Sequence, residues 1–483
     1  MRRIAVLGGG ISALTFAYWR SRAGRHGNGE PDGREPAEIV VLDPAPGPAG
    51  SSWTLREGDL VLEAGPQTLR ETPAAARLLD ALGLRDEVLV ADPRAPRWIV
   101  RKGRPRSFVA GPAGLLSRAL SPGAKLRALC EPFVPRRPAS LADESVRAFL
   151  ERRFGTGAAR SLAEPLASGV HADDPATLSV RSAFPALWDA EARAGSVVRG
   201  LLGSRRGGGP PGRRGTGGRP PRPLPPRTIS FSRGLATLPE ALAAAVATQG
   251  VRVERDVRIE AIEGPLDDVR EPRNPRAFRL LSEDGRTFEA DALVSTLDAR
   301  SVARLLGDLL PRSRGRLAAL SSSRLAVVLQ AFRLETPSAA PRGFGVLIPR
   351  GEGYRSLGLL HLSSLFPSRT PSGTAVLTSF LGGALEPGLA GAAEDDLLRL
   401  AEEETRRLHP GLGPRVLART VRWDGALPRI PVGHHATLDL LDEDLHSLGM
   451  ARPLPLLAVT GPWRDGVALG ERIARGEELA GSF

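Results

Sequence analysis

Short apolar runs that are typical of buried strands recur at the beginning, in the middle and at the end of the chain. The runs at 4–7 and 39–42 each follow polar residues and end at a glycine or an acid, and similar runs occupy 292–294 and 456–459. Continuous apolar runs of this length indicate parallel strands that are buried on both faces. The pattern therefore predicts a doubly wound α/β sheet assembled from separated parts of the chain.

Apolar residues at helical intervals predict several helices. The expected helices cover 74–82, 141–154, 234–246, 394–408 and 467–479, and most of 109–200 is expected to be helical. Asp143 is expected to cap the helix at 141–154. Three β-rich stretches at 325–332, 357–362 and 374–381 predict a second sheet. A chain of 483 residues exceeds one typical core, so two or more domains are expected.

A glycine-rich turn directly follows the first apolar run. It begins at Gly8-Gly9-Gly10, and Asp43 ends the second run. In a βαβ unit such glycines let backbone N–H groups approach a pyrophosphate, and the acid accepts ribose hydroxyls. The polar, glycine-rich stretch at 21–38 accounts for the long spacing as a surface insertion. A signal peptide over residues 2–19 is the alternative, but three consecutive glycines in its apolar part argue against it.

The basic charge is concentrated in one segment. Residues 203–227 contain seven arginines and no acid, so removing them lowers the net charge from +12 to +5. A Gly/Pro/Arg segment cannot bury a core, and we expect a solvated, disordered insertion. A tail that touches acidic lipid headgroups or RNA is the alternative. No aromatic residue interrupts the segment, which argues against nucleic-acid binding by stacking.

Few residues offer metal or disulfide chemistry. The single cysteine, Cys130, excludes an internal disulfide and a multi-cysteine metal site. The adjacent pair His434-His435 lacks the spacing of metal ligands and is expected to be exposed or in a turn, so no metal site is expected. No apolar run reaches the roughly 18 residues that span a bilayer, which predicts a soluble or peripheral protein.

Further strings, spread over nearly the whole chain, carry a family resemblance. They are GGGIS (8–12), EAGP (63–66), RWIVRKGRP (97–105), SGVHADDPATLSVRSAFPALWDAE (168–191), GLATLPEAL (234–242), GFGVLIP (343–349), SLFPSR (364–369), FLGG (380–383), LPRIPVGH (427–434) and DGVALGERIARG (465–476). With these strings the chain resembles the FAD-dependent protoporphyrinogen/coproporphyrinogen oxidases of the flavin amine oxidase superfamily. It departs from their pattern at Gln67, where many relatives have arginine, and at Glu471-Arg472, where Asp-Cys is usual.

The resemblance implies an enzyme of haem biosynthesis. It implies FAD as the cofactor, protoporphyrinogen IX or coproporphyrinogen III as the substrate, and dioxygen as the electron acceptor. The flavin supplies the chemistry, so no catalytic side chain is expected. Another oxidase or desaturase of the superfamily is the first alternative, and a non-catalytic flavin-fold protein is the second. The choice between the two porphyrinogens and the oligomeric state both stay open.

The resemblance also implies a set of contact residues. The cofactor contacts are Gly8, Gly9, Gly10, Ile11, Ser12 and Ala13 at the pyrophosphate, Asp43 at the ribose, Gly65, Pro66, Gln67 and Thr68 at the flavin, Val257 at the adenine, and Val467, Ala468 and Leu469 over the pyrophosphate. Core packing is an equally good interpretation of Val257 and Val467. The substrate contacts are Arg97, whose guanidinium pairs with a propionate, and Phe344, Leu347 and Phe380 around the macrocycle.

The implied fold is a Rossmann-like FAD-binding domain built from separated segments, with an α+β substrate domain and a helical insertion. The FAD-binding domain is expected at 1–90, 229–300 and 423–483, the substrate domain at 91–108 and 301–422, the helical region at 109–202 and the disordered insertion at 203–228. The helical region matches the part with which family members contact a membrane. A cytoplasmic protein with peripheral contact at the inner face of a membrane is therefore expected, and nucleic acid is not an expected partner.

Overall fold

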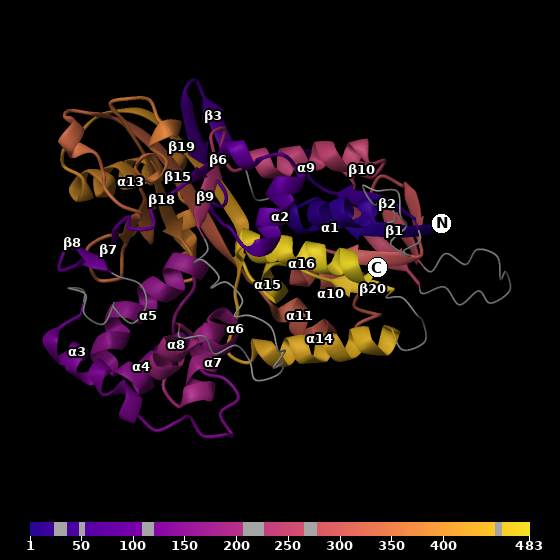
Figure 1. Cartoon of the computed structure of the whole chain (residues 1–483), viewed down its shortest axis with the longest axis horizontal. Coiled ribbons are helices and arrows are strands. Elements are labelled where there is room, and N and C mark those ends of the chain that lie inside the picture. Colours follow the sequence, from indigo (N-terminus) through magenta and orange to yellow (C-terminus); the bar gives the residue numbers. More distant parts are fainter. Residues whose placement is uncertain (24–35, 48–53, 109–119, 206–226, 265–277, 450–455) are drawn as a thin grey trace, which may run out of the picture. The chain divides into compact units, whose positions relative to one another are not determined.

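The computed structural model forms two compact units, each assembled from separated segments (Figure 1). It describes residues 1–23, 36–47, 54–108, 120–205, 227–264, 278–449 and 456–483. Unit 1 comprises 1–90, 228–321 and 436–483, and unit 2 comprises 91–227 and 322–435. Most of the predicted insertion at 203–228 and part of the helical region at 109–202 lie outside the described residues.

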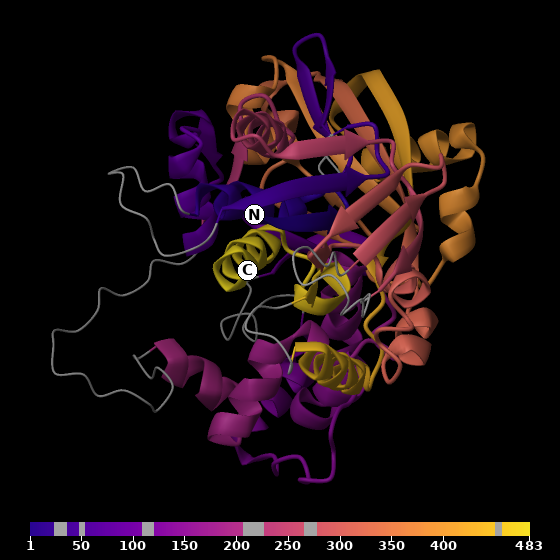
Figure 2. The ribbon, with the colours of Figure 1, turned by 90° about the vertical axis from the view of Figure 1, so that its right-hand side faces the viewer.

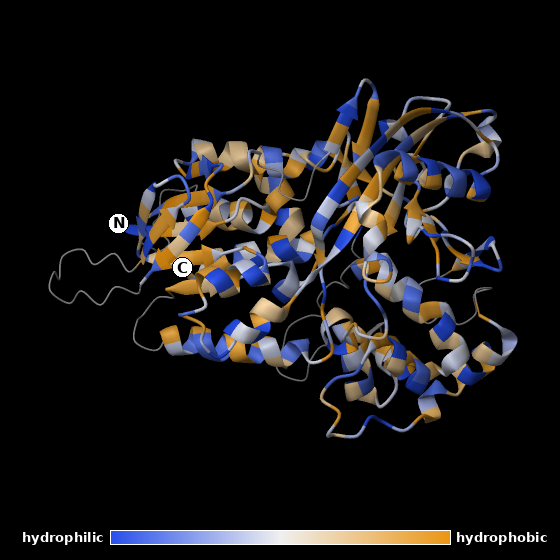
Figure 3. Cartoon of the chain, turned by 180° about the vertical axis from the view of Figure 1, so that it is seen from behind, coloured by the Kyte–Doolittle hydropathy of each residue, from blue (hydrophilic) through white to orange (hydrophobic). Residues whose placement is uncertain are grey.

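A five-stranded parallel sheet forms the centre of unit 1. Its strand order is β10 (Arg252–Arg255), β2 (Ala37–Asp43), β1 (Arg2–Leu7), β14 (Ala292–Ser295) and β20 (Leu457–Val459). All neighbouring strands pair in parallel. All four apolar runs from the sequence are strands of this sheet, which confirms the prediction of an α/β sheet. Figure 3 shows the strands beside the N-terminus in the colour of hydrophobic residues.

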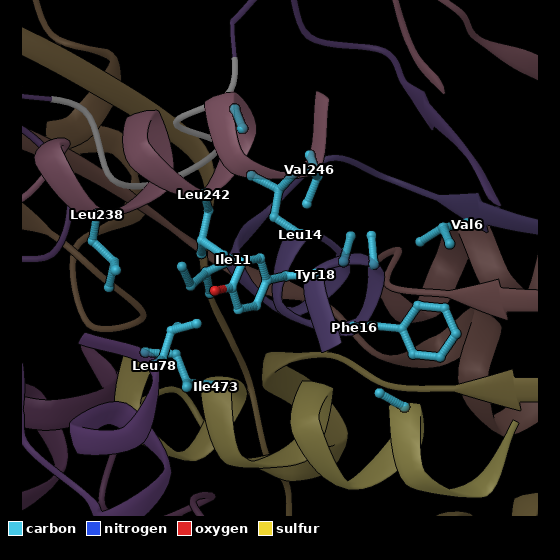
Figure 4. Close-up of a cluster of buried hydrophobic side chains, with 14 of the residues drawn as sticks. Val6, Ile11, Leu14, Phe16, Tyr18, Leu78, Leu238, Leu242, Val246 and Ile473 are labelled. Atoms are coloured by element: carbon cyan, nitrogen blue, oxygen red, sulfur yellow. The ribbon is translucent and has the colours of Figure 1, made fainter. Parts of the chain in front are cut away.

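Alternating side chains of these strands enter two separate cores. Ile4 and Val6 join one core with α1 (Ile11–Arg22), α2 (Pro73–Ala81), α9 (Thr237–Thr248) and α16 (Leu469–Ser482). Figure 4 shows side chains of these helices directed toward one another. Ala5 and Leu7 join the other core with α10 (Ala299–Leu305), α11 (Arg314–Ala319) and α14 (His434–Gly449). Burial on both faces is the reason that the strands read as continuous apolar runs.

Smaller sheets complete unit 1. They are the antiparallel sheet of β11 (Ile259–Glu263), β12 (Phe278–Ser282) and β13 (Thr287–Ala290), the hairpin of β3 (Thr54–Glu57) and β4 (Leu60–Glu63), and the sheet of β5 (Leu69–Arg70), β9 (Thr228–Phe231) and β6 (Val88–Val90). The two termini of the chain lie side by side in this unit (Figure 2). The Arg2 guanidinium lies 5.5 Å from the centre of the Phe483 ring.

Unit 2 contains a seven-stranded sheet. Its order is β19 (Leu412–Pro428), β15 (Ser322–Leu334), β18 (Thr374–Gly382), β17 (Gly358–Leu360), β16 (Gly345–Leu347), β7 (Arg97–Arg101) and β8 (Arg104–Phe108). Only β16 and β7 pair in parallel among these strands. The helix α13 (Glu394–Leu408) packs on the sheet through Leu397 and Ala401, and its bounds agree with the helix expected at 394–408.

Helices form most of the described residues 120–205 of unit 2, which we call the helical lobe. They are α3 (Pro122–Leu129), α4 (Val146–Phe154), α5 (Thr156–His171), α6 (Val180–Ala183), α7 (Pro185–Ala194) and α8 (Val197–Arg205). Within the described part of the chain, no helix is both long and apolar enough to cross a membrane.

The expected cap of the helix at 141–154 is wrong. The helix begins only at Val146, and the Ser145 hydroxyl accepts the amide of Ala148 at 3.2 Å. Asp143 instead accepts the Ser179 hydroxyl at 2.8 Å and the Gly433 amide at 2.7 Å. Because the Asp143 carboxylate bonds to two segments that are distant in the sequence, Ser145 caps the helix instead. Its hydroxyl accepts a backbone amide of the first helical turn, as an aspartate cap would.

Candidate functional site

The glycine turn lies at the carboxyl edge of the parallel sheet in unit 1. Gly8 has φ of +95° and donates its amide to Leu42 O at 2.8 Å, so the turn is tied to the end of β2. A β-carbon at Gly9 would lie 1.9 Å from Asp43 Oδ2. Only glycine permits this approach, which brings the turn and the acid together at the edge where open α/β sheets bind ligands.

Asp43 is a buried acid at this edge. Its side chain is only 5% exposed, and its Oδ1 accepts the amide of Ala45 at 3.1 Å. Burial raises the pKa of Asp43, while the amides of Ala45 and Gly9 act in the opposite direction. Val257 donates its amide to Asp43 O at 3.0 Å, and its side chain is buried in the adjoining core. The residues predicted for the ribose and the adenine are therefore neighbours.

The first turn of α1 offers donors to an anion. Gly10 is its N-cap and has no side chain to satisfy the first amides of the helix. The Ser12 hydroxyl is buried and has no hydrogen-bond partner among the described residues. The side chains of Ile11 and Ala13 pack into the core, so only their backbone remains for a ligand. An uncapped helix start beside a buried hydroxyl fits a pyrophosphate.

The segment after β4 is held in place by buried polar groups. Gln67 Nε2 donates to Glu63 O at 2.7 Å and Gly65 O at 2.9 Å, while Gln67 Oε1 is buried without a hydrogen-bond partner among the described atoms. The Glu63 carboxylate, which sequence reasoning missed, is fully buried and accepts the Thr54 hydroxyl at 2.6 Å and the Leu235 amide at 2.9 Å. The sequence offered one signal for this role, because Glu63 is an acid in the otherwise apolar strand β4. Pro66 and Thr68 are half-buried beside this bend.

The start of α16 approaches the glycine turn from the other end of the chain. Ala468 is the N-cap of α16, Val467 precedes it half-buried, and Leu469 is buried in the core. Arg472, another residue that sequence reasoning did not assign, places Nη2 3.4 Å from the position of a β-carbon on Gly10. Burial lowers the pKa of Arg472 to about 10, so the guanidinium is charged at neutral pH. The edge thus has a cation beside the uncapped start of α1.

Three of the four predicted substrate residues share one sheet face in unit 2. Leu347, Gly358 and Phe380 lie opposite one another on β16, β17 and β18, and Gly345 lies opposite Arg97 on β7. Residues that are paired across strands, or two apart along one strand, point to the same face. Arg97, Leu347 and Phe380 therefore lie on the same face.

Arg97 carries an available guanidinium. Its side chain is exposed and makes no hydrogen bond or ion pair with the residues that the structure describes. Its Cζ lies 4.9 Å from the centre of the half-buried Phe344 ring, which is a cation–π contact. A guanidinium above an apolar face can bind a carboxylate through two parallel hydrogen bonds.

The helix α5 covers this face at Leu347. A β-carbon on Gly169 would lie 2.8 Å from Leu347 Cδ2, so the glycine allows the helix to approach the sheet. The neighbouring Val170 remains 48% exposed. All four predicted substrate residues thus lie on unit 2, where Arg97 contacts Phe344 and shares a sheet face with Leu347 and Phe380, and α5 adds apolar surface beside Leu347.

The histidines differ from their expected positions. His434 begins α14 and is 2% exposed, so the expectation of an exposed or turn residue is wrong for it. His361 Nε2 and His409 Nε2 lie 3.1 Å apart in unit 2. No group of three or more metal-ligating side chains occurs within the described ranges.

The parallel sheet and the glycine turn at its edge are those of a dinucleotide-binding protein. A family model of the flavin containing amine oxidoreductases matches residues 34–464, and the chain belongs to this family. It is an FAD-dependent oxidoreductase, and the carboxyl edge described above fits the dinucleotide.

Curated relatives align over nearly the whole chain. Protoporphyrinogen oxidase 2 of Arabidopsis thaliana is 28% identical over 99% of this chain and 93% of its own. The coproporphyrinogen III oxidase of Bacillus subtilis is 22% identical over 99% of this chain and 96% of its own.

Solved structures share the fold. A protein from Exiguobacterium sp. 255-15 superposes with a TM-score of 0.76 at 21% identity, covering 100% of this chain and 98% of the other. Cyclohexylamine oxidase from Brevibacterium oxydans has a TM-score of 0.67 at 16% identity, covering 99% and 98%. The likeness therefore extends across amine oxidases and does not itself select a substrate.

Proposed function

We propose that the protein oxidises a porphyrinogen, protoporphyrinogen IX or coproporphyrinogen III, to the porphyrin with dioxygen as the final electron acceptor. The observation that carries the proposal is the unpaired Arg97 guanidinium on the same sheet face as Leu347 and Phe380, within the described part of unit 2. A flat, apolar macrocycle with propionate side chains has the chemistry that this face would recognise. The names of the relatives from Arabidopsis and Bacillus support the same substrate class.

The proposed roles follow from the side chains. Arg97 binds a propionate carboxylate and fixes the orientation of the macrocycle. Phe344, Leu347 and Phe380 contact its apolar faces and exclude water. In unit 1, the amides at Gly9 and Gly10 and the Asp43 carboxylate hold the pyrophosphate and ribose of FAD. The bound flavin supplies hydride acceptance and reoxidation by dioxygen.

Replacing Arg97 tests the proposal. Arg97→Ala should raise KM for the porphyrinogen about tenfold or more, since a charge-assisted hydrogen bond contributes roughly 1.5–3 kcal/mol. Arg104→Ala, an exposed arginine on β8, is the matched control and should leave KM unchanged. Aerobic turnover of both porphyrinogens, followed by porphyrin fluorescence, gives KM and kcat. Flavin-loaded protein that oxidises neither substrate would refute the function, and an unchanged KM in Arg97→Ala would refute the role of the arginine.

We also propose that the helical lobe contacts a membrane surface peripherally. Leu126 and Leu129 are 67% and 61% exposed on one face of α3, and Phe133, which follows shortly after, is 82% exposed. Large apolar side chains that are gathered on a short surface segment favour interfacial insertion. Replacing Leu126, Leu129 and Phe133 together with serine should reduce co-sedimentation with phosphatidylcholine vesicles, and unchanged co-sedimentation would refute the contact.

A further inference from the structure

The helical lobe contains a cavity that neither the cofactor nor the proposed substrate uses. Its volume is about 530 Å³, and it lies between the segment 136–142 and the helices α6 and α7. Arg136, Arg137 and Arg181 supply its basic lining, and Trp188 and Glu191 supply the α7 side. Three guanidinium groups around one cavity make it a candidate anion site.

Glu191, the single acid in the lining, is ion-paired with the lining residue Arg137, at 3.3 Å between Arg137 Nη1 and Glu191 Oε2, and with two arginines outside the cavity. Glu191 is 1% exposed, and its Oε1 lies 2.7 Å from Arg152 Nη1 and 3.3 Å from Arg153 Nη1. Neither of these two arginines lines the cavity. Arg136 and Arg181 form no ion pair with the residues that the structure describes, so the lining keeps two positive charges that Glu191 does not balance, and an anion is the complementary ligand.

The lining arginines retain donors that can face a ligand. Arg137 is held in place, with Cζ 3.5 Å from the centre of the Trp188 ring, and its Nη1 donates to Trp188 O at 3.2 Å and to Glu191 Oε2 at 3.3 Å. Arg181 donates from Nη1 to Ala142 O at 2.8 Å. The Arg136 guanidinium makes no hydrogen bond or ion pair with a described residue and lies over Gly195. Each guanidinium has five N–H donors, so several remain for an oxyanion such as phosphate.

The exposed apolar side chains of the lobe favour a lipid headgroup as the source of the phosphate. Phe133 precedes Arg136 by three residues, which limits the distance between their α-carbons to about 11 Å. An exposed aromatic beside a basic cavity suits a lipid whose acyl chains meet the apolar residues and whose headgroup phosphate enters the cavity. We propose that Arg136, Arg137 and Arg181 form a binding site for the phosphate of an anionic phospholipid. The proposal rests on the membrane contact proposed above.

The test compares vesicles of phosphatidylcholine with and without phosphatidylglycerol. The full-length double variant Arg136→Gln/Arg181→Gln should bind the anionic vesicles roughly tenfold more weakly and the neutral vesicles unchanged. Arg160→Gln, an exposed arginine on α5 of the same lobe, is the matched control and should retain the wild-type affinity. The arginine-rich segment at 203–227 is present in every variant, so the difference reports the cavity alone. A thermal melt checks that the double variant is folded.

Each other outcome overturns the proposal in a recognisable way. Equal losses in the double variant and in Arg160→Gln would show diffuse attraction and no site. If the protein binds both kinds of vesicle equally well, the membrane contact is supported and the phosphate site is refuted. Absence of binding to any vesicle would refute both proposals. Isothermal titration calorimetry with inorganic phosphate separates the two sources of phosphate. If the protein binds inorganic phosphate but no vesicle, the cavity is a site for free phosphate and the proposed lipid site is refuted.

Discussion

At the scale of single residues, the proposed FAD site depends on the close approach of Gly9 and Asp43. The buried carboxylate fills the space that a side chain at Gly9 would occupy. Asp43→Asn keeps this shape but removes the charge, so the dissociation constant of FAD should rise about tenfold or more. Titration of the apoprotein with FAD, followed by flavin fluorescence, measures it. Glu38→Gln at the opposite end of β2 is the control, and equal affinities of the two variants would contradict the role of Asp43.

Arg472 provides a second test at this scale. Its guanidinium lies beside Gly10 at the uncapped start of α1. Because a cation here attracts a pyrophosphate, Arg472→Gln should weaken FAD binding roughly tenfold and reduce its dependence on salt. Arg475→Gln, one turn further along α16, removes an arginine that pairs with Asp465 and Glu478 and should have little effect. A wild-type salt dependence in Arg472→Gln would place the guanidinium outside the phosphate site.

These residues show what can be predicted at this scale. The glycine turn and Asp43 were identifiable because a strand, a turn and a second strand follow one another in the sequence. The approach of Arg472 to Gly10 joins opposite ends of the chain, and no local pattern encodes it. Glu63 had a local signal, an acid at the end of an apolar strand, but its carboxylate also accepts the amide of Leu235, which is 172 positions away in the sequence.

At the scale of elements, the strands of the parallel sheet were predictable and the second sheet was only partly so. Burial on both faces made β1, β2, β14 and β20 continuous apolar runs. The long strand β19 has no such run, because polar residues alternate along it and its register is set by pairing with β15. The helix α14 was missed although Leu438, Leu441 and Leu445 recur at helical intervals.

The histidine pair that links elements of unit 2 predicts sensitivity to acid. His361 follows β17 and His409 ends α13, and their Nε2 atoms lie 3.1 Å apart. Burial lowers the pKa of His361 to about 3 and of His409 to about 4. Both are neutral in the folded protein at pH values where the unfolded chain, with a histidine pKa near 6.5, takes up protons. The stability that the neutral pair contributes is therefore complete above about pH 6.5 and is lost as the pH falls toward these values.

Urea unfolding at pH 7 and at about pH 5.5 measures this loss. The free energy of unfolding should fall by about 1 kcal/mol per histidine over this interval. His409→Gln retains an amide that can bond to His361 but removes one titrating group, so the loss should be smaller by about 1 kcal/mol. His446→Gln, an exposed histidine on α14, should keep the full loss. The same pH dependence in both variants would contradict a role for the pair.

At the scale of the whole molecule, the two predicted sites lie on different compact units. Every residue predicted to contact the cofactor belongs to unit 1, and every residue predicted to contact the substrate belongs to unit 2. The parallel sheet brings the glycine turn, Asp43 and the start of α16 to one edge, while the seven-stranded sheet brings Arg97 and Phe380 to one face. The sequence indicated this division through its separated apolar runs, but it could not show which strands pair within the second sheet.

Hydrogen exchange can test this division in the intact protein. Ligands slow exchange where they order the backbone. FAD added to the apoprotein should protect peptides that contain Gly9, Asp43 and Ala468. A porphyrin, the proposed product, added to the FAD-loaded protein should protect peptides of β16 and β18 and the end of α5, because these segments surround Leu347. Peptides of α13, which packs on the seven-stranded sheet through Leu397 and Ala401, serve as the internal reference and should change little in either experiment. Protection of unit 1 alone by the porphyrin would move the substrate site away from Arg97, whereas protection of β16 and β18 would support the assignment of the substrate to unit 2.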